Sequence, residues 1–150
     1  MTTASGRLPA RPGTYVLLLR NPRSVRVRAG SLGLCDFPRG WYLYTGSAFG
    51  PGGLAARIGR HLRPDKSCRW HIDYLTAALP VRRVWLTTSP LRAECAWADL
   101  LARLGGVPAV KGFGASDCTC AAHLFRFPAR PALGRFRQGA GVPVQVVVTG

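Results

Sequence analysis

Short apolar runs separated by turn residues recur along the chain and predict β-strands. Residues 15–20 are mostly apolar and lie between a glycine and an Asn-Pro pair, which is typical of a buried strand that ends in a turn. Residues 24–28 alternate between valine and arginine, as expected of an edge strand whose charged side faces solvent. Residues 41–45, 81–88 and 123–127 predict three further strands. We expect the strands to pair in a small antiparallel sheet.

The order of side chains in the aromatic strand predicts which of them share a face of the sheet. Because a strand has a period of two, Tyr42 and Tyr44 lie on one face, and Trp41 and Leu43 lie on the other. The glycine-rich stretch that follows, residues 47–53, predicts a loop. We therefore expect Tyr44 to lie near the end of its strand.

Two segments after this loop have the apolar spacing of amphipathic helices. Residues 54–62 place leucine and isoleucine on one stripe of a helix, and the stripe ends with Leu62. Arg57 and His61 flank this stripe and are neighbours one turn apart. Residues 70–79 predict a second helix with a buried apolar side, which the following proline ends.

A third helix is expected from Ser89 to Leu104, with Ser89 as its N-cap and Pro90 as its first helical residue. Glu94, the only glutamate in the chain, falls on the apolar face of this helix. In that register it lies past the first turn, where the helix dipole gives an anion little stabilisation. An unpaired carboxylate on an apolar face is costly, so we expect Glu94 to bind a metal ion and a neutral glutamine there to cost no stability.

The chain length and composition indicate one globular α/β (α+β) domain, with helices flanking the antiparallel sheet. A chain of 150 residues with 47% hydrophobic residues is long enough to bury one core. We expect residues 1–12 to be flexible and residues 13–127 to form the domain. Residues 128–150 are rich in Pro, Gly and Arg and predict a mobile basic tail, although residues 144–148 could add an edge strand.

The charge of the chain points to a polyanionic partner. Twenty-one Lys and Arg against six Asp and Glu give a net charge of +15. Arginine codons in a GC-rich genome are an alternative explanation, but residues 1–30 hold six arginines and no acid. A guanidinium fork suits phosphate oxygens, so nucleic acid is the expected partner. With neither a membrane-length apolar run nor a signal peptide, the chain is expected to be cytoplasmic, and its oligomeric state stays open.

Five cysteines without a secretory signal predict reduced thiols. Cys118, Cys120 and His123 lie close together, but a structural zinc site needs a fourth ligand and usually a wider cysteine spacing. We therefore expect structural thiols and a packing histidine at these positions.

The candidate chemistry lies in two tyrosines on adjacent strands, an Arg and a His beside a helix stripe, and one acid. Hydrolysis of a phosphodiester bond uses such parts. A carboxylate holds a metal ion, a cation stabilises the charge on phosphorus, and a phenol or imidazole helps to deprotonate water. The alternative is a basic module that keeps the same fold and binds nucleic acid without turnover.

The order of these residues resembles the GIY-YIG nuclease family, whose two name motifs correspond to Gly13-Thr-Tyr15 and Tyr44-Thr-Gly46. The resemblance extends over residues 13–127 and is closest to the Uri-like branch, in the segments Tyr42–Ala48, Arg60–Arg63, Trp70–Leu75, Glu94–Cys95 and Gly112–Cys118. It implies a metal-dependent endonuclease that uses Mg²⁺ or Mn²⁺. The implied catalytic residues are Tyr15, Tyr44, Arg57, His61 and Glu94, with Glu94 as metal ligand. Similar domains are joined to DNA glycosylases of the endonuclease III type, which favours DNA as substrate and a role in DNA repair.

The chain departs from the family pattern in two places. Threonine replaces the central isoleucine of both name motifs, and residues 49–53 lengthen the loop before Arg57. Arg60 is therefore the alternative to Arg57. If Glu94 does not hold the metal ion, Asp73 or Asp117 is the next candidate for its ligand. We otherwise expect Asp73 and His71 to have structural roles. The predicted contacts to nucleic acid are Arg60, Arg63 and Lys66.

Overall fold

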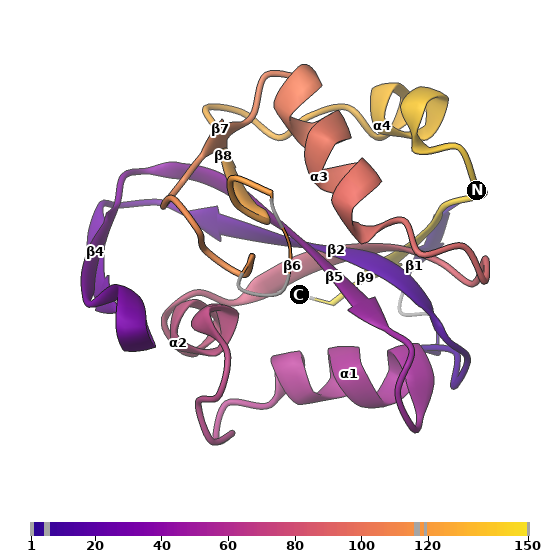
Figure 1. The fold of residues 1–150 in the computed structure, drawn as a ribbon, viewed down its shortest axis with the longest axis horizontal. Coiled ribbons are helices and arrows are strands. Elements are labelled where there is room, and N and C mark those ends of the chain that lie inside the picture. Colours follow the sequence, from indigo (N-terminus) through magenta and orange to yellow (C-terminus); the bar gives the residue numbers. More distant parts are fainter. Residues whose placement is uncertain (1, 5–6, 116–117, 119, 150) are drawn as a thin grey trace.

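The computed structural model describes residues 2–4, 7–115, 118 and 120–149. Its centre is a seven-stranded sheet in the order β1-β9-β6-β2-β5-β8-β7 (Figure 1). Strand β1 pairs in parallel with β9, and all other neighbours pair antiparallel. The bounds of the strands are β1 Thr2–Ala4, β2 Gly13–Asn21, β5 Gly40–Ala48, β6 Val81–Thr87, β7 Val107–Pro108, β8 Leu124–Phe127 and β9 Gln145–Val148. The expected antiparallel sheet flanked by helices is confirmed.

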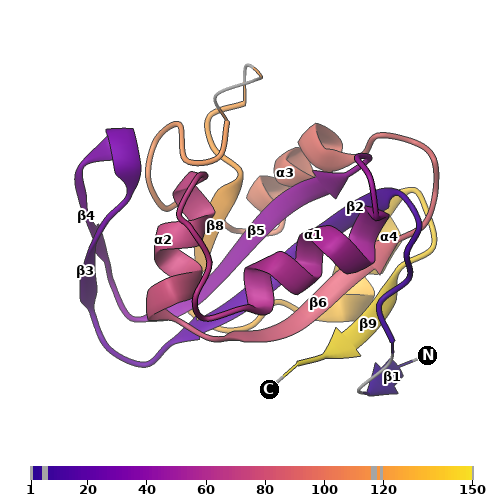
Figure 2. The same cartoon turned by 90° about the horizontal axis from the view of Figure 1, so that it is seen from below.

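Helices cover both faces of the sheet. Helices α1 (Gly53–Leu62) and α2 (His71–Ala78) lie on one face, and α3 (Glu94–Arg103) and α4 (Leu133–Ala140) lie on the other (Figures 1 and 2). Each face has its own apolar cluster, because the strands between the helix layers send alternate side chains to opposite sides. The sheet is thus the middle layer of three.

The alternation in the two central strands follows the predicted pattern. Tyr42 and Tyr44 belong to the cluster under α1 and α2, whereas Leu43 belongs to the cluster under α3 and α4, with Trp41 packed against it. Strand β2 is buried on both faces, which explains its almost continuous apolar sequence. The predicted division of the aromatic side chains between the two faces is confirmed.

The valine and arginine strand does not join the central sheet. Strand β3 (Val25–Arg28) pairs with β4 (Leu34–Phe37), a strand that the sequence did not predict, in a separate two-stranded sheet. Both edges of β2 are already taken by β5 and β6, so a neighbouring strand has no place there. The alternation itself is confirmed, since Arg26 and Arg28 are exposed and the valines are half-buried.

Two helix predictions need correction. In α1, His61 is buried and Leu62 is 38% exposed, so the buried side of the helix ends at His61 and not at Leu62 as predicted. Helix α3 begins at Glu94 and not at Pro90. The hydroxyl of Ser89 accepts a hydrogen bond from the amide of Leu91 (3.3 Å), which stabilises a local turn in place of a helix. Glu94 is therefore in the first turn of its helix.

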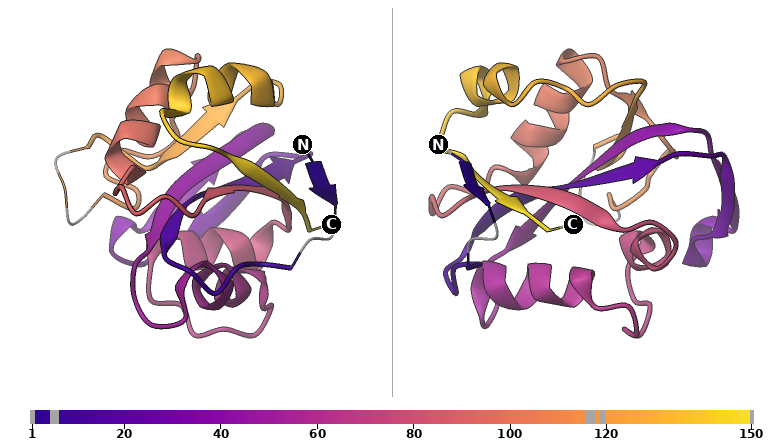
Figure 3. Two further views of the ribbon diagram at one scale, coloured as in Figure 1. Left: turned by 90° about the vertical axis from the view of Figure 1, so that its right-hand side faces the viewer. Right: turned by 180° about the vertical axis from the view of Figure 1, so that it is seen from behind.

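The prediction of a mobile basic tail is wrong. Residues 133–140 form α4, whose Phe136 is fully buried with ring centroids 4.9 Å from Trp85 and 5.0 Å from Trp97. Strand β9 then joins the sheet and lies beside β1, which falls within the stretch expected to be flexible (Figure 3).

Within the described residues, no helix is long and apolar enough to cross a bilayer.

Candidate active site

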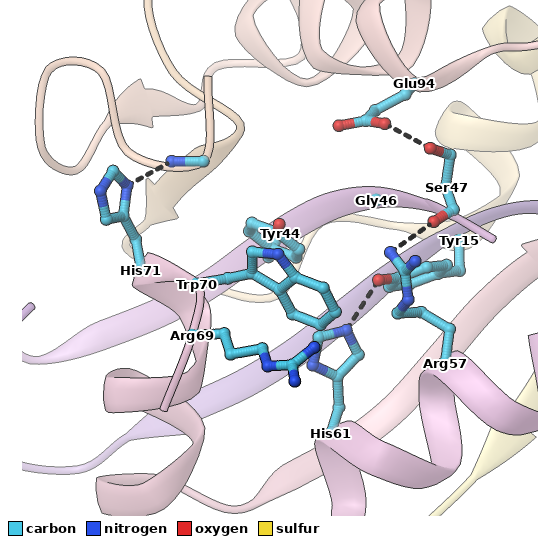
Figure 4. A pocket seen from close by; sticks show the side chains of 11 residues that line it. Tyr15, Tyr44, Gly46, Ser47, Arg57, His61, Arg69, Trp70, His71 and Glu94 are labelled. Atoms are coloured by element: carbon cyan, nitrogen blue, oxygen red, sulfur yellow. Dashed lines mark hydrogen bonds between the residues drawn. The ribbon is translucent and has the colours of Figure 1, made fainter. Parts of the chain in front are cut away.

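A pocket of about 210 Å³ gathers all five residues predicted to be catalytic (Figure 4). Tyr15 comes from β2, Tyr44 from β5, Arg57 and His61 from α1, and Glu94 from α3. The pocket is also lined by Gly46, Ser47, Arg69, Trp70, His71 and Gly114. One cavity therefore holds five residues that are far apart in the sequence and lie on four different elements.

The position of the pocket in the sheet allows groups from both faces to meet. Pairing between β5 and β8 reaches only Tyr44, so one edge of β5 is open beyond that point except for the bond from the Thr45 amide to the His123 carbonyl. Gly46 adds no side chain there. As a result Glu94, from the α3 side of β5, reaches the same cavity as Arg57 and His61 from the α1 side (Figure 4).

Close packing explains why positions 13 and 46 are occupied by glycine. A Cβ atom on Gly46 would lie 2.5 Å from the Cζ and Oη atoms of Tyr15, its partner across the two strands. A Cβ atom on Gly13 would lie 2.0 Å from the carbonyl oxygen of Thr87 on the neighbouring strand. Both contacts are far below van der Waals distance, so a side chain at either position would displace the sheet or the Tyr15 ring.

Tyr15 and His61 form a buried pair at the floor of the pocket. The Tyr15 hydroxyl lies 2.7 Å from Nε2 of His61, and the two residues are 1% and 2% exposed. Burial raises the pKa of Tyr15 well above its ordinary value, with a further increase from Tyr44. Burial also lowers the pKa of His61 to about 3. Both side chains are therefore neutral at physiological pH.

The buried His61 is expected to make the fold sensitive to mild acid. Its pKa falls from an ordinary 6.5 to about 3 in the folded chain, so below pH 6.5 only the unfolded chain takes up this proton. The stability that the neutral imidazole supports is complete above that pH and is lost as the pH falls toward 3. The expected loss is up to about 1.4 kcal/mol per pH unit.

The measurement is urea unfolding of the wild type and His61→Gln between about pH 7 and pH 5. Other titrating groups act in both proteins, so the difference between the two free energies of unfolding isolates His61. As the pH falls, the free energy of unfolding of the wild type should decrease relative to that of His61→Gln. Parallel pH curves for the two proteins would show that His61 titrates normally in the fold.

The guanidinium of Arg57 lies in the wall of the pocket. Its Nη1 donates a hydrogen bond to the Ser47 carbonyl (3.0 Å), and its Cζ lies 4.6 Å from the centroid of the Trp70 ring. These contacts hold a half-buried cation beside Tyr15 with part of its donor set directed to the cavity (Figure 4). The longer loop before α1 does not remove Arg57 from the predicted site.

Arg60, the alternative to Arg57, has a different place. Its guanidinium makes a two-pronged pair with Asp73, with Nη1 to Oδ1 at 2.7 Å and Nη2 to Oδ2 at 2.9 Å. Asp73 is fully buried and also accepts from the amides of Arg69 and Trp70, at the start of α2. The expected structural role of Asp73 is confirmed, and the geometry favours Arg57 as the arginine of the pocket.

The other two predicted contacts to nucleic acid follow the end of α1. The Lys66 ammonium donates to the carbonyls of His61 (3.2 Å) and Arg63 (2.9 Å), which stabilises the C-terminus of the helix. Arg63 is exposed. Their contacts with nucleic acid stay predictions, as does that of Arg60.

Glu94 has partners on both of its oxygens. Its Oε1 accepts from the Ser47 hydroxyl (2.7 Å), and its Oε2 lies 2.6 Å from Nδ1 of the buried His123. Burial alone would raise the pKa of Glu94, but the hydrogen bonds from His123 and Ser47 outweigh it and lower the pKa below the ordinary value. The carboxylate is therefore ionised at neutral pH, and its place in the first turn of α3 adds to that preference.

The sequence did not single out several residues that shape the site. Ser47 and Trp70 line the pocket, and His123 contacts Glu94. His71 accepts a hydrogen bond at Nδ1 from the Gly114 amide (3.0 Å), so it ties α2 to the loop before β8. His71 also lines the pocket, so its structural role stays a prediction. Asp117, one alternative metal ligand, is outside the described residues.

Comparison with known proteins identifies a family for most of the chain. Residues 14–140 match the family described as Domain of unknown function DUF123, and the chain belongs to that family. No curated protein and no solved structure matches the chain significantly.

Proposed function

We propose that this protein is a metal-dependent endonuclease that hydrolyses phosphodiester bonds, with DNA as the favoured substrate. The observation that carries the proposal is the single pocket that unites Tyr15, Tyr44, Arg57, His61 and Glu94. A net charge of +15 supports nucleic acid as the substrate, because such a field attracts polyanions over a long range. Charge alone is equally compatible with a module that only binds, but such a module has no need for this pocket.

The donor set of the pocket fits a Mg²⁺ or Mn²⁺ ion. Glu94 is the only carboxylate among the described residues that line the pocket, it is ionised, and its side chain is 25% exposed. Mg²⁺ commonly uses one or two carboxylates together with water and phosphate oxygens, so a single carboxylate suffices. When bound there, the cation would neutralise charge on the scissile phosphate and lower the pKa of the attacking water.

The other side chains have distinct roles in the proposed reaction. Arg57 contacts a non-bridging phosphate oxygen and stabilises the charge that grows on it as water attacks. Tyr15 and His61, which form a 2.7 Å contact, orient the attacking water by hydrogen bonds. Tyr44 keeps its proton, because burial raises its pKa, and donates a hydrogen bond toward the substrate.

The proposed function is tested by comparing Arg57→Ala with Arg82→Ala in a cleavage assay with Mg²⁺ or Mn²⁺. Arg82 is exposed on β6 and does not line the pocket, so the two variants lose the same charge. Loss of a contact to the transition state should slow cleavage by about 100-fold or more in Arg57→Ala. Arg82→Ala should cleave within about 2-fold of the wild type. Equal rates for Arg57→Ala and the wild type would contradict the assignment.

Binding to nucleic acid is expected to be mainly electrostatic and to depend little on sequence. For duplex DNA, each phosphate neutralised contributes about 0.9 to the slope of log affinity against log salt. Fluorescence anisotropy with several unrelated sequences, measured over a range of salt with EDTA present, should show a steep and common slope. A flat response, or no binding at low salt, would contradict the expected phosphate contacts.

A further inference from the structure

A second cluster of chemically active side chains lies next to the pocket. Sγ of Cys95, Cys118 and Cys120 and a ring nitrogen of His123 all lie within 4.8 Å of one another. Nε2 of His123 is 3.3 Å from Sγ of Cys118 and 3.9 Å from Sγ of Cys95. Cys95 is the second residue of α3, and the other three residues lie in the segment that leads into β8. The structure thus supplies the fourth ligand that the sequence spacing lacked.

We propose that Cys95, Cys118, Cys120 and His123 bind one structural zinc ion. Thiolates and a neutral imidazole are the ligands that zinc prefers in closed four-coordinate sites. With Zn–S near 2.3 Å and Zn–N near 2.0–2.1 Å, the ligand atoms of a tetrahedral site lie about 3.5–3.8 Å apart. The separations in the cluster are close to that range, so small side-chain movements would complete the site. Four protein ligands leave no position for a substrate.

The surroundings of His123 support this assignment. The ring is 2% exposed, and the contacts of Nε2 among the described residues are with sulfur atoms, which are weak hydrogen-bond partners. Nδ1 faces the Glu94 carboxylate at 2.6 Å, which fixes Nε2 as the atom directed to the thiols. A carboxylate behind a ligating histidine is the usual arrangement at zinc sites.

The zinc ion would join two walls of the pocket. The described residues between β7 and β8, which are 109–115, 118 and 120–123, form no helix or strand, and this connection supplies Gly114 to the pocket. Linking it to the first turn of α3 would fix its position relative to Glu94. The inference concerns metal content and does not depend on nuclease activity, so either proposal can fail alone.

The test begins with metal analysis of protein purified under reducing conditions without added metal. We expect about one zinc per chain in the wild type and in Cys68→Ser, a control at an exposed cysteine outside the cluster. Cys95→Ser and Cys118→Ser should each lower the zinc content about 10-fold or more. Zinc retained in both cluster variants would identify an adventitious ion only and overturn the proposal.

X-ray absorption on the wild type provides a second measurement that needs no variant to fold. We expect a first shell of three sulfur atoms and one nitrogen, and thiolate charge-transfer bands after replacement by Co²⁺. The proposal is overturned by wild-type protein that contains no zinc and gives no such bands with Co²⁺. A disulfide between two cluster cysteines, or an iron–sulfur chromophore, would also overturn it.

Discussion

Replacing Glu94 by glutamine is expected to slow cleavage by about 100-fold or more while affinity for nucleic acid stays within about 2-fold. The substitution keeps the shape of the side chain but removes the only carboxylate that the described part of the chain brings to the pocket. Without that charge the pocket loses its ligand for a divalent cation. The measurements are single-turnover cleavage and fluorescence anisotropy on the same preparation.

The control is Asp99→Asn, which removes an exposed acid from the same helix. Asp99 faces Arg103 at 3.7 Å and lies outside the pocket, so this variant should cleave like the wild type. A wild-type rate for Glu94→Gln would show that Glu94 does not hold the metal. Asp73 would be a poor replacement, because it is fully buried in its pair with Arg60 and does not line the pocket.

Glu94→Gln is expected to lower stability, whereas the apolar helix face alone predicts that glutamine there costs no stability. The native carboxylate accepts from Ser47 and contacts His123, and it lies in the first turn of α3. Its lowered pKa means that this contribution is present at neutral pH and is lost as the pH falls through that pKa. We therefore expect metal-free Glu94→Gln to lose about 0.5–2 kcal/mol at neutral pH.

Replacing Phe136 by alanine is expected to lower the free energy of unfolding by about 3–5 kcal/mol. The ring is fully buried between Trp85 of the sheet and Trp97 of α3, so its loss leaves a cavity that neither rigid neighbour can fill. A loss of this size is a large part of the total stability of about 5–15 kcal/mol that is usual for a domain.

Urea unfolding of Phe136→Ala and Leu91→Ala tests whether the C-terminal segment belongs to the core. Leu91 is 64% exposed, so its replacement should change the free energy of unfolding by less than about 0.5 kcal/mol. If Phe136→Ala is as stable as the wild type, residues 128–150 behave as the mobile tail that their composition suggests.

Local patterns were sufficient to predict the centre of the fold. The period of two in β5 identified the face shared by Tyr42 and Tyr44, because side chains two residues apart on a strand point to the same side of the sheet. The stripe of α1 likewise placed Arg57 at the edge of the buried side, whereas His61 proved to be buried itself. The resemblance to a known family then selected five residues, and the structure brings these five together.

Features that depend on distant contacts could not be predicted in this way. The C-terminal segment is rich in Pro, Gly and Arg, and the burial of Phe136 comes from tryptophans far away in the sequence. The start of α3 could not be predicted for a different, local reason. A turn at Ser89 competes with a helix cap in the same sequence. Cys95 belongs to the cysteine cluster only because α3 begins beside the segment before β8.

The most direct test of the central claim is single-turnover cleavage by the wild-type protein over a panel of labelled nucleic acids. The panel contains single-stranded DNA, duplex DNA, flap DNA, damaged duplex and RNA, with protein in excess at low salt. We predict cleavage of at least one DNA form with Mg²⁺ or Mn²⁺, none with EDTA, and cleavage about 100-fold or more slower by Glu94→Gln purified in parallel. Tight binding to the panel with no cleavage of any member in either metal would contradict the claim and leave a protein that only binds nucleic acid.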